Sequence, residues 1–186
     1  MKRVRLVGAI AILLGAALMT TEAAAADLEN TLYMDLEHGR VVIEMRPDLA
    51  PRHVEQIKRL ARSGFYDGVV FHRVIDGFMA QGGDPTGTGT GGSGNKLPAE
   101  FSKEPHVRGV ASMARTQDPD SADSQFFIMF APAPHLDGQY TVWGKVTKGM
   151  EFIDKLKRGD NNRGGVVADP DKIVRMQVAG DAEKAN

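Results

Sequence analysis

Apolar and polar residues alternate in two short stretches near the start of the chain, at Leu32–Leu36 and at Val41–Met45. Alternation with a period of two is typical of a strand that buries one face and exposes the other. His38 and Gly39 separate the two stretches, and a short polar break that contains glycine favours a tight turn. The pattern therefore predicts a β-hairpin.

The spacing of apolar residues changes at Pro51 and becomes that of a helix. The apolar positions that follow are Val54, Ile57, Leu60 and Ala61. Residues three and four positions apart share one face of a helix. Pro51 suits a first helical turn, and Gly64 suits the end of a helix. The pattern predicts an amphipathic helix over residues 51–62.

Short apolar runs separated by glycine and proline fill most of the remaining chain. They cover residues 69–75, 78–81, 107–114, 126–130, 140–147 and 172–178. A second helical pattern lies at 149–158, where Ile153 and Leu156 are apolar, and Gly159 would end it. Many short strands with few helices favour a mainly β fold. We expect a closed or nearly closed antiparallel sheet whose open ends are covered by the two helices.

Residues 1–26 predict a cleaved secretory signal peptide. Three basic residues stand within the first five positions, an uncharged apolar run follows from Leu6 to Met19, and Ala24–Ala26 fits a cleavage site of small residues. A transmembrane anchor is the alternative, but this run of 14 residues is short, since crossing a bilayer takes about 20. We therefore expect residues 27–186 to form a single mature domain in the periplasm or outside the cell.

Composition excludes several classes of function. The 186 residues include no cysteine, which excludes a disulfide scaffold, a cysteine-ligated zinc site, an iron–sulfur cluster and a thiol nucleophile. The formal net charge is −1, and it is −3 for residues 27–186. Nucleic-acid binding needs a basic face, so we expect no nucleic-acid partner. No segment after residue 26 has the length and apolar character of a membrane span.

Two apparent motifs lack the context that their chemistry requires. Gly87–Gly92 matches the G-x-G-x-x-G pattern of dinucleotide-binding proteins, but Pro85 precedes it and Pro98 follows it, so no helix can begin there comfortably. We expect a flexible surface loop instead. The five histidines show no tight metal-ligand spacing, and no G-x-S-x-G nucleophile elbow occurs. We therefore expect neither a metal site nor covalent catalysis.

One predicted strand contains a charged residue among apolar neighbours. Arg73 lies between Phe71 and Val74, and alternation alone could point its side chain to solvent. The residues around it favour a different interpretation. The whole block from Phe71 to Asp84, FHRVIDGFMAQGGD, resembles the signature of the cyclophilins, the cyclosporin-type peptidyl-prolyl cis–trans isomerases.

Three further blocks resemble the same family in the same order: Ser112–Ala114, Ser124–Ile128 and Leu136–Gly138. The resemblance covers about residues 30–178, which is nearly the whole predicted mature chain. It implies a closed antiparallel barrel of eight strands with a helix at each end. That architecture agrees with the pattern of short strands described above.

The resemblance also implies a site. It places Arg73 on the catalytic arginine of the family, and Gln81 and Gln125 on polar positions that hold the substrate backbone or Arg73 itself. Ala114 falls on a neighbouring subsite. The positions of the proline-ring pocket are occupied by Phe78, Met79, Phe127 and Leu136.

Three candidate substrate-binding positions depart from the pattern of the family. Arg115 stands where eukaryotic members usually have an asparagine that contacts the substrate backbone. Tyr140 stands where many members have a pocket histidine, and tyrosine keeps both an aromatic wall and a hydroxyl group. His135 stands where many members have a tryptophan that helps to bind cyclosporin, so we expect weakened cyclosporin binding.

Rotation about an Xaa-Pro bond breaks no covalent bond, so it needs no nucleophile, metal or cofactor. The barrier is about 18–20 kcal/mol, and the unaided reaction takes tens to hundreds of seconds. In the twisted state the prolyl nitrogen regains a lone pair that can accept a hydrogen bond. A guanidinium donor at that nitrogen would bind the twisted state better than either planar isomer, which is what accelerates a reaction.

Two hypotheses from different classes follow. The first is a peptidyl-prolyl cis–trans isomerase that assists the folding of exported proteins, with proline-containing unfolded or flexible polypeptides as its partners. The second is a non-catalytic proline-peptide binding module, or holdase chaperone. A pure binder would need the apolar pocket but neither Arg73 nor Gln81. Nothing in the sequence indicates an obligate oligomer, so we expect a monomer.

Overall fold

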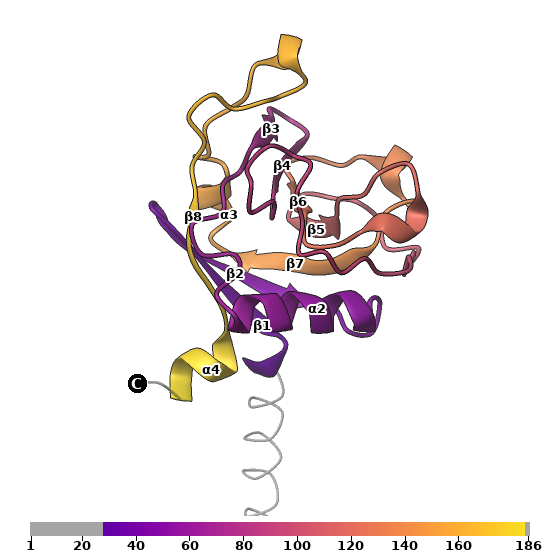
Figure 1. The fold of residues 1–186 in the computed structure, drawn as a ribbon, viewed down its shortest axis with the longest axis vertical. Helices are drawn as coiled ribbons and strands as arrows, with labels where there is room; N and C mark the ends of the chain where they lie inside the picture. Colours follow the sequence, from indigo (N-terminus) through magenta and orange to yellow (C-terminus); the bar gives the residue numbers. More distant parts are fainter. Residues whose placement is uncertain (1–27, 185–186) are drawn as a thin grey trace, which may run out of the picture.

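The computed structural model describes residues 28–184, which form a curled sheet with helices packed against it (Figure 1). The strands are β1 (Thr31–Leu36), β2 (Gly39–Met45), β3 (Arg73–Ile75), β4 (Met79–Gly82), β5 (Val110–Met113), β6 (Phe126–Met129), β7 (Val142–Lys148) and β8 (Ile173–Val178). The α-helices are α2 (Pro51–Arg62), α3 (Met150–Ile153) and α4 (Ala179–Lys184). Short 3-10 helices are η1 (Pro119–Ser121), η2 (Pro134–Leu136) and η3 (Asn161–Arg163).

The eight strands form one antiparallel sheet in the order β3-β4-β6-β5-β7-β2-β1-β8. The two outer strands approach each other, because an isolated bridge pairs Val70 with Lys172 just before each strand begins. Beside this bridge, the backbone N–H of Phe71 donates to the carbonyl of Asp171 at 2.9 Å. The expected mainly β, eight-stranded antiparallel fold is confirmed, and a few backbone bonds rather than a full ladder close it.

The predicted hairpin and first helix are both confirmed. β1 and β2 pair from Thr31–Glu44 to Leu36–Gly39, and their apolar residues face the core. α2 has the predicted bounds and buries one face against β7 and β8. Its first turn is capped from a distant loop, because the Glu100 carboxylate accepts the backbone N–H groups of Arg52 and His53 at 3.2 and 3.1 Å.

The second predicted helix is shorter than residues 149–158. α3 ends at Ile153, because the next turn tightens: the backbone N–H groups of Lys155 and Leu156 donate three residues back, at 3.3 and 3.2 Å. The backbone N–H of Lys157 then donates to the Asp171 carboxylate at 2.7 Å. Residues 154–156 form only a turn and a bend. The structure also contains α4, which the sequence pattern did not predict and which packs against β1 and β8.

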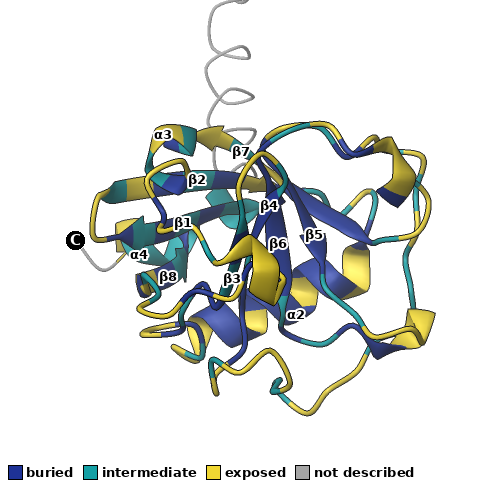
Figure 2. Ribbon diagram, turned by 90° about the horizontal axis from the view of Figure 1, so that it is seen from above, coloured by how far each residue is buried: buried dark blue, intermediate teal, exposed yellow. Residues whose placement is uncertain are grey.

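Two apolar clusters lie on opposite sides of the curled sheet. The larger one fills the space between the strands and α2, where Trp143, Phe126 and Ile57 are completely buried. Figure 2 shows the inner face of α2 and the central strands as buried. The smaller cluster contains Met79 and Phe127 and forms the floor of the candidate site described below.

The predicted signal peptide, residues 1–26, lies outside the described residues. Among residues 28–184, no helix combines the length and apolar character required of a bilayer span.

Candidate active site

A cavity of about 210 Å³ opens over the smaller apolar cluster. It is lined by Arg73, Phe78, Met79, Gln81, Ala114, Arg115, Phe127, Leu136 and Tyr140. The structure therefore brings together nine of the eleven residues that the sequence singled out. Gln125 does not line this cavity but lines an adjoining cavity beside the glycine-rich loop. His135 is exposed and lies outside the cavity lining, with its ring stacked on that of Phe78 at 5.9 Å between centroids.

The sheet register explains why residues far apart in sequence meet here. β3 and β4 form a hairpin that pairs Arg73 with Gln81, and β4 pairs Gln81 with Phe127 of β6. Directly opposite residues of antiparallel strands point to the same face. The cation, the amide and the aromatic ring consequently form one row across three strands. Because side chains alternate along a strand, Met79 shares the face of Gln81.

Two hydrogen bonds fix the Arg73 guanidinium. Its Nε donates to the carbonyl of Gly164 at 2.9 Å, and one Nη donates to Oε1 of Gln81 at 3.2 Å. The other Nη has no hydrogen-bond partner among residues 28–184. Partial burial lowers the pKa of Arg73 from its ordinary value, but an arginine remains charged at any physiological pH. The side chain therefore presents free donors and a full charge at the rim of an apolar cavity.

The hydrogen-bond chain continues behind Gln81. Its amide donates to Oε1 of Gln125 at 3.0 Å, and the amide of Gln125 donates to the carbonyls of Gly89 and Gly91 at 3.1 and 2.8 Å. The glycine-rich segment is a loop, as expected. Its backbone carbonyls form the last link of a chain that starts at Arg73.

Asp84 anchors that loop through hydrogen bonds to its backbone. Its fully buried carboxylate accepts the backbone N–H groups of Thr86, Gly89 and Gly91 at 2.8, 2.6 and 3.1 Å. Burial by itself would raise the pKa of the Asp84 carboxyl, but the hydrogen bonds from Thr86, Gly91 and Gly89 outweigh it and lower the pKa to about 2. Asp84 is therefore ionised at neutral pH and holds the loop in one arrangement.

Aromatic and aliphatic side chains form the apolar part of the cavity. Phe127 and Leu136 are 5% and 8% exposed, so almost all of their surface is already covered by protein. The ring of Tyr140 meets that of Phe127 edge-on, with 5.5 Å between their centroids. These side chains form an apolar wall on one side of the cavity, whereas Arg73 contributes a charged group to its lining.

A polar triplet supports this wall from behind. The ring of His106 stacks on that of Phe127 at 6.2 Å between centroids. One His106 nitrogen lies 2.9 Å from the Ser112 hydroxyl, and the other lies 3.0 Å from the Asp137 carboxylate. This arrangement resembles a hydrolase triad, but Ser112 is 0% exposed and no substrate can reach it. The triplet is therefore a support for Phe127 and not a nucleophilic site.

Arg115 forms the border of the cavity. Two of its nitrogens donate to the carbonyl of Gln139 at 3.1 and 2.9 Å, and a third donates to the carbonyl of Thr116 at 2.8 Å. Its guanidinium lies 4.7 Å from the centroid of the Tyr140 ring. Arg115 thus connects the loop after β5 to the segment that carries Tyr140.

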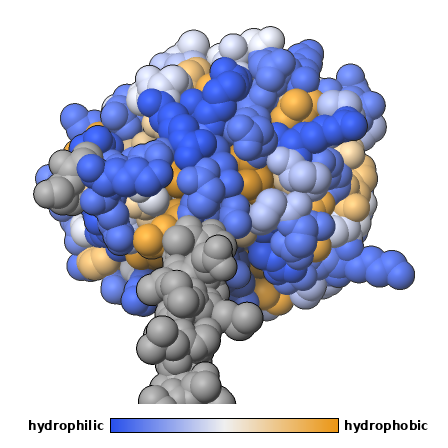
Figure 3. Space-filling model, turned by 90° about the horizontal axis from the view of Figure 1, so that it is seen from below, coloured by the Kyte–Doolittle hydropathy of each residue, from blue (hydrophilic) through white to orange (hydrophobic). Residues whose placement is uncertain are grey.

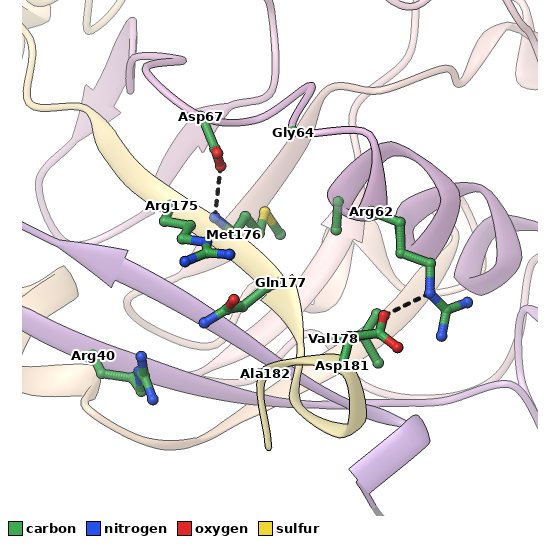
Figure 4. Close-up of a pocket in the computed structure, with 11 residues that line it drawn as sticks. Arg40, Arg62, Gly64, Asp67, Arg175, Met176, Gln177, Val178, Asp181 and Ala182 are labelled. Atoms are coloured by element: carbon green, nitrogen blue, oxygen red, sulfur yellow. Dashed lines mark hydrogen bonds and ion pairs between the residues drawn. The ribbon is translucent and has the colours of Figure 1, made fainter. Parts of the chain in front are cut away.

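A larger cavity of about 650 Å³ lies elsewhere, between the end of α2, β8 and α4 (Figure 4). Arg62 there pairs with Asp181 and Glu29, with 2.7 Å between each pair of atoms. The lining residues include no aromatic ring. Figure 3 shows that the face of the molecule seen from this side is mostly hydrophilic. Although this cavity is larger than the one beside Arg73, it lacks an apolar wall against which an uncharged ring could pack.

Residues 28–184 contain no group of three or more histidine, aspartate or glutamate side chains arranged to hold a metal ion. Two of the buried histidines form structural contacts with carboxylates. His53 pairs with Glu100 at 2.6 Å, and His106 pairs with Asp137 at 3.0 Å.

The sequence did not indicate several residues that complete the site. Gly164, which receives the hydrogen bond from Arg73, follows η3 in a segment 91 residues away along the chain. Its positive φ of 67° is conformationally easy only for glycine, so the Gly164-Gly165 pair signals a turn. No local pattern, however, says that this turn lies beside β3. The anchoring role of Asp84 was equally invisible, because it depends on the three-dimensional path of the loop.

Comparison with known proteins agrees with the geometry. The sequence pattern of the family described as "Cyclophilin type peptidyl-prolyl cis-trans isomerase/CLD" matches residues 31–178. The probable peptidyl-prolyl cis-trans isomerase of Brucella suis is 54% identical over 173 residues, covering 87% of this chain and 88% of that protein. Peptidyl-prolyl cis-trans isomerase B of Bacillus subtilis is 48% identical over 134 residues, covering 70% of this chain and 93% of that protein.

Solved structures give the same answer for the fold. The cyclophilin AquaCyp293 from Hirschia baltica has a TM-score of 0.73 at 30% identity, covering 82% of this chain and 74% of that one. A Cryptosporidium parvum cyclophilin type isomerase, crystallised in the presence of the dipeptide Ala-Pro, has a TM-score of 0.73 at 30% identity, covering 80% and 98%. The chain therefore belongs to the cyclophilin family and is a peptidyl-prolyl cis–trans isomerase.

Proposed function

We propose that the cavity beside Arg73 binds the ring of a substrate proline, and that Arg73 accelerates rotation about the peptide bond before it. The position of Arg73 carries this proposal. It is a half-buried cation, held by Gly164 and Gln81, with free donors at the edge of an apolar cavity. The substrates are proline-containing segments of unfolded or flexible polypeptides.

The chemistry follows from what changes during the rotation. The planar amide nitrogen has no available lone pair, whereas the twisted nitrogen can accept a hydrogen bond from Arg73. Binding that favours the twisted state lowers the barrier, and each 1.4 kcal/mol of preference is about tenfold in rate. Donors fixed before the reaction need not be reoriented during it, so the hydrogen bond from Arg73 to Gln81 contributes to the rate.

The apolar wall has two roles in this proposal. It holds the pyrrolidine ring against Phe127 and Leu136 while the preceding carbonyl rotates. It also excludes water from the neighbourhood of Arg73, and a charge acts more strongly on its target in a medium of low dielectric constant. Covalent or metal chemistry is not required at any step.

Exchange NMR on a short Xaa-Pro peptide tests the proposal against the holdase alternative. We expect residues 27–186, added at a small fraction of the peptide concentration, to speed cis–trans exchange well above the unaided rate. Peptide resonances that shift on binding without faster exchange would instead identify a non-catalytic binding module. Residues 27–186 are used because they contain every element of the site.

We further propose that the enzyme acts on newly exported proteins, in the periplasm or outside the cell. Support comes from the positive start, apolar run and small-residue cleavage site within residues 1–26. Proteins that cross a membrane unfolded contain many Xaa-Pro bonds that must reach their native isomer, and the uncatalysed step is slow enough to limit folding.

A further inference from the structure

A second cavity adjoins the proline cavity and shares part of its wall. It has a volume of about 520 Å³ and lies under the glycine-rich loop. Gln81, Ala114 and Arg115 line both cavities. A residue of extended chain spans about 3.3–3.6 Å. A peptide whose proline fills the first cavity therefore places a residue near that proline in the second.

Two cations line this second cavity without a carboxylate partner. Lys96 is exposed, and its ammonium group has neither a hydrogen bond nor an ion pair among residues 28–184. Arg115 donates only to the neutral carbonyls of Gln139, Thr116 and Gln117. By contrast, Arg108 forms a two-pronged pair with Asp154 at 2.9 and 2.6 Å.

The one carboxylate in the lining is already occupied. Oδ1 of Asp123 accepts the backbone N–H and the hydroxyl of Ser93, and its Oδ2 accepts the backbone N–H of Gly94 at 2.8 Å. Asp123 therefore anchors the end of the glycine-rich loop. These neutral donors hold its carboxylate against the loop without cancelling its charge, and neither Lys96 nor Arg115 forms an ion pair with it.

The acidic residues on neighbouring elements lie outside the lining of this cavity. The Glu100 carboxylate is held by His53 at 2.6 Å. Asp120 and Asp118, on and beside η1, accept backbone N–H groups at 2.8 and 2.9 Å. With Arg73 in the first cavity, the joined groove contains three cations and one carboxylate, in a chain whose residues 27–186 have a net charge of −3.

We propose that the second cavity binds an acidic side chain, so that this isomerase prefers Xaa-Pro segments with an aspartate or glutamate close to the proline. The inference rests on the proposed function, since it assumes that the proline ring occupies the first cavity. A partly exposed charge pair contributes up to about 1 kcal/mol, which corresponds to a preference of about fivefold. Lys96 and Arg115 are the residues that determine it.

A matched peptide series tests the preference. Each peptide contains one Ala-Pro bond in an otherwise neutral chain, with glutamate, glutamine or lysine placed once before and once after this bond. We expect kcat/KM to follow the order glutamate, glutamine, lysine at one of the two placements. The glutamate-to-glutamine ratio should be about fivefold. It should fall toward one at about 1 M salt, where charges are screened beyond about 3 Å.

Variants assign the effect to its residues. Lys96→Gln and Arg115→Gln should each lower the glutamate-to-glutamine ratio, whereas Arg115→Lys, which keeps the charge, should retain it. Lys148→Gln is the control, because it removes the same charge from the far end of β7, outside both cavity linings. A ratio within one enzyme cancels any general loss of activity. Lys96 is also exposed, so its variant is expected to fold.

The outcomes separate this inference from the function on which it rests. Equal rates for glutamate, glutamine and lysine peptides at both placements would overturn the acidic preference while leaving the isomerase intact. Absence of faster exchange for every peptide, including the neutral ones, would overturn the proposed function instead. A preference that Lys148→Gln lowers as much as Lys96→Gln would mean that the net charge of the protein acts, not this cavity.

Discussion

The direction of the Arg73 side chain is set by residues on three separate segments. β3 carries the arginine, β4 carries Gln81, and the turn after η3 supplies the carbonyl of Gly164. A free arginine has considerable rotamer entropy, and ordering it costs up to about 2 kcal/mol. Here that cost is met during folding, so the donors are already in place when a substrate arrives.

Phe127 is the residue whose removal tests the apolar pocket. We predict that Phe127→Ala weakens binding of a prolyl peptide about tenfold or more, because the proline ring loses its main apolar contact. The change also removes a nearly buried ring, and such truncations cost roughly 3–5 kcal/mol of stability. Peptide titration by NMR, done at a temperature where circular dichroism shows the variant folded, measures the binding. Unchanged affinity in the folded variant would remove Phe127 from the pocket.

His135 is the residue that bears on cyclosporin. Its ring stacks on Phe78 but lies outside the cavity lining, so it offers a smaller apolar surface at the rim than tryptophan would. We predict weak inhibition of this protein by cyclosporin and tighter inhibition of His135→Trp. Inhibition constants measured in the peptide exchange assay test this. Tight inhibition of the unmodified protein would show that His135 does not limit cyclosporin binding.

At the scale of elements, the hairpin of β3 and β4 explains the eight-residue spacing between Arg73 and Gln81. The tight connection between the two strands places them directly opposite each other. The sequence revealed this spacing through its resemblance to a family, and the strand register supplies the physical reason. The resemblance also placed Phe127 in the pocket, but no local pattern showed that β6 lies beside β4 or that the turn after η3 lies beside β3, because both arise only through long-range pairing.

The glycine-rich loop shows the limit of reading by composition. Its seven glycines within residues 82–94 predicted flexibility, yet Asp84 binds three of its backbone N–H groups. Glycine is needed at Gly91 for another reason: a Cβ there would lie 2.2 Å from the Asp84 carboxylate. The glycines thus let the backbone of the loop approach the buried Asp84 carboxylate. Composition alone cannot distinguish such an ordered loop from a disordered one.

This loop yields a prediction for Asp84→Asn. The amide nitrogen would face N–H donors that the carboxylate now accepts, so we predict a loss of about 2–4 kcal/mol in the free energy of unfolding. Turnover should also fall, because Gln125 would lose the ordered carbonyls of Gly89 and Gly91. Denaturant unfolding and peptide exchange measure the two effects. Asp169→Asn, at a carboxylate that is 92% exposed, is the control and should change neither.

The same residue gives the stability a defined pH dependence. Asp84 has a pKa of about 2 in the folded chain against an ordinary value of 3.8, so its stabilising contribution is complete above about pH 4 and disappears as the pH falls toward 2. The difference in unfolding free energy between the unmodified protein and Asp84→Asn should therefore shrink from pH 5 to pH 2. A difference that stays constant over this range would show that the charge of Asp84 is not what stabilises the loop.

At the scale of the whole molecule, the sequence predicted the class of fold and most of the site but not how the sheet closes. Alternation identified the strands because one face of each is buried, and Pro51 and Gly64 marked the bounds of α2. Closure depends on pairing between residues near 70 and 172, which no local pattern encodes. The chain after α3 likewise depends on a distant residue, since the Asp171 carboxylate accepts the backbone N–H of Lys157.

The predicted export signal also belongs to this scale. We predict that the protein purified from its own cell envelope or medium begins near Asp27, because Ala24–Ala26 fits the cleavage site. Sequencing of the N-terminus after cell fractionation checks this. A cytoplasmic protein that still begins at Met1 would contradict the proposed role in folding exported proteins, without affecting the site.

The central claim is that Arg73 favours the twisted amide over both planar isomers. Comparing peptide affinity with exchange rate in the unmodified protein, Arg73→Ala and Arg73→Lys tests it most directly. We predict that Arg73→Ala retains peptide affinity within a few-fold and loses exchange by on the order of 10²-fold or more, equivalent to about 2.7 kcal/mol. Arg73→Lys should recover only part of the rate, since lysine lacks the planar fork of donors. Near-normal exchange in a folded Arg73→Ala variant would contradict the account.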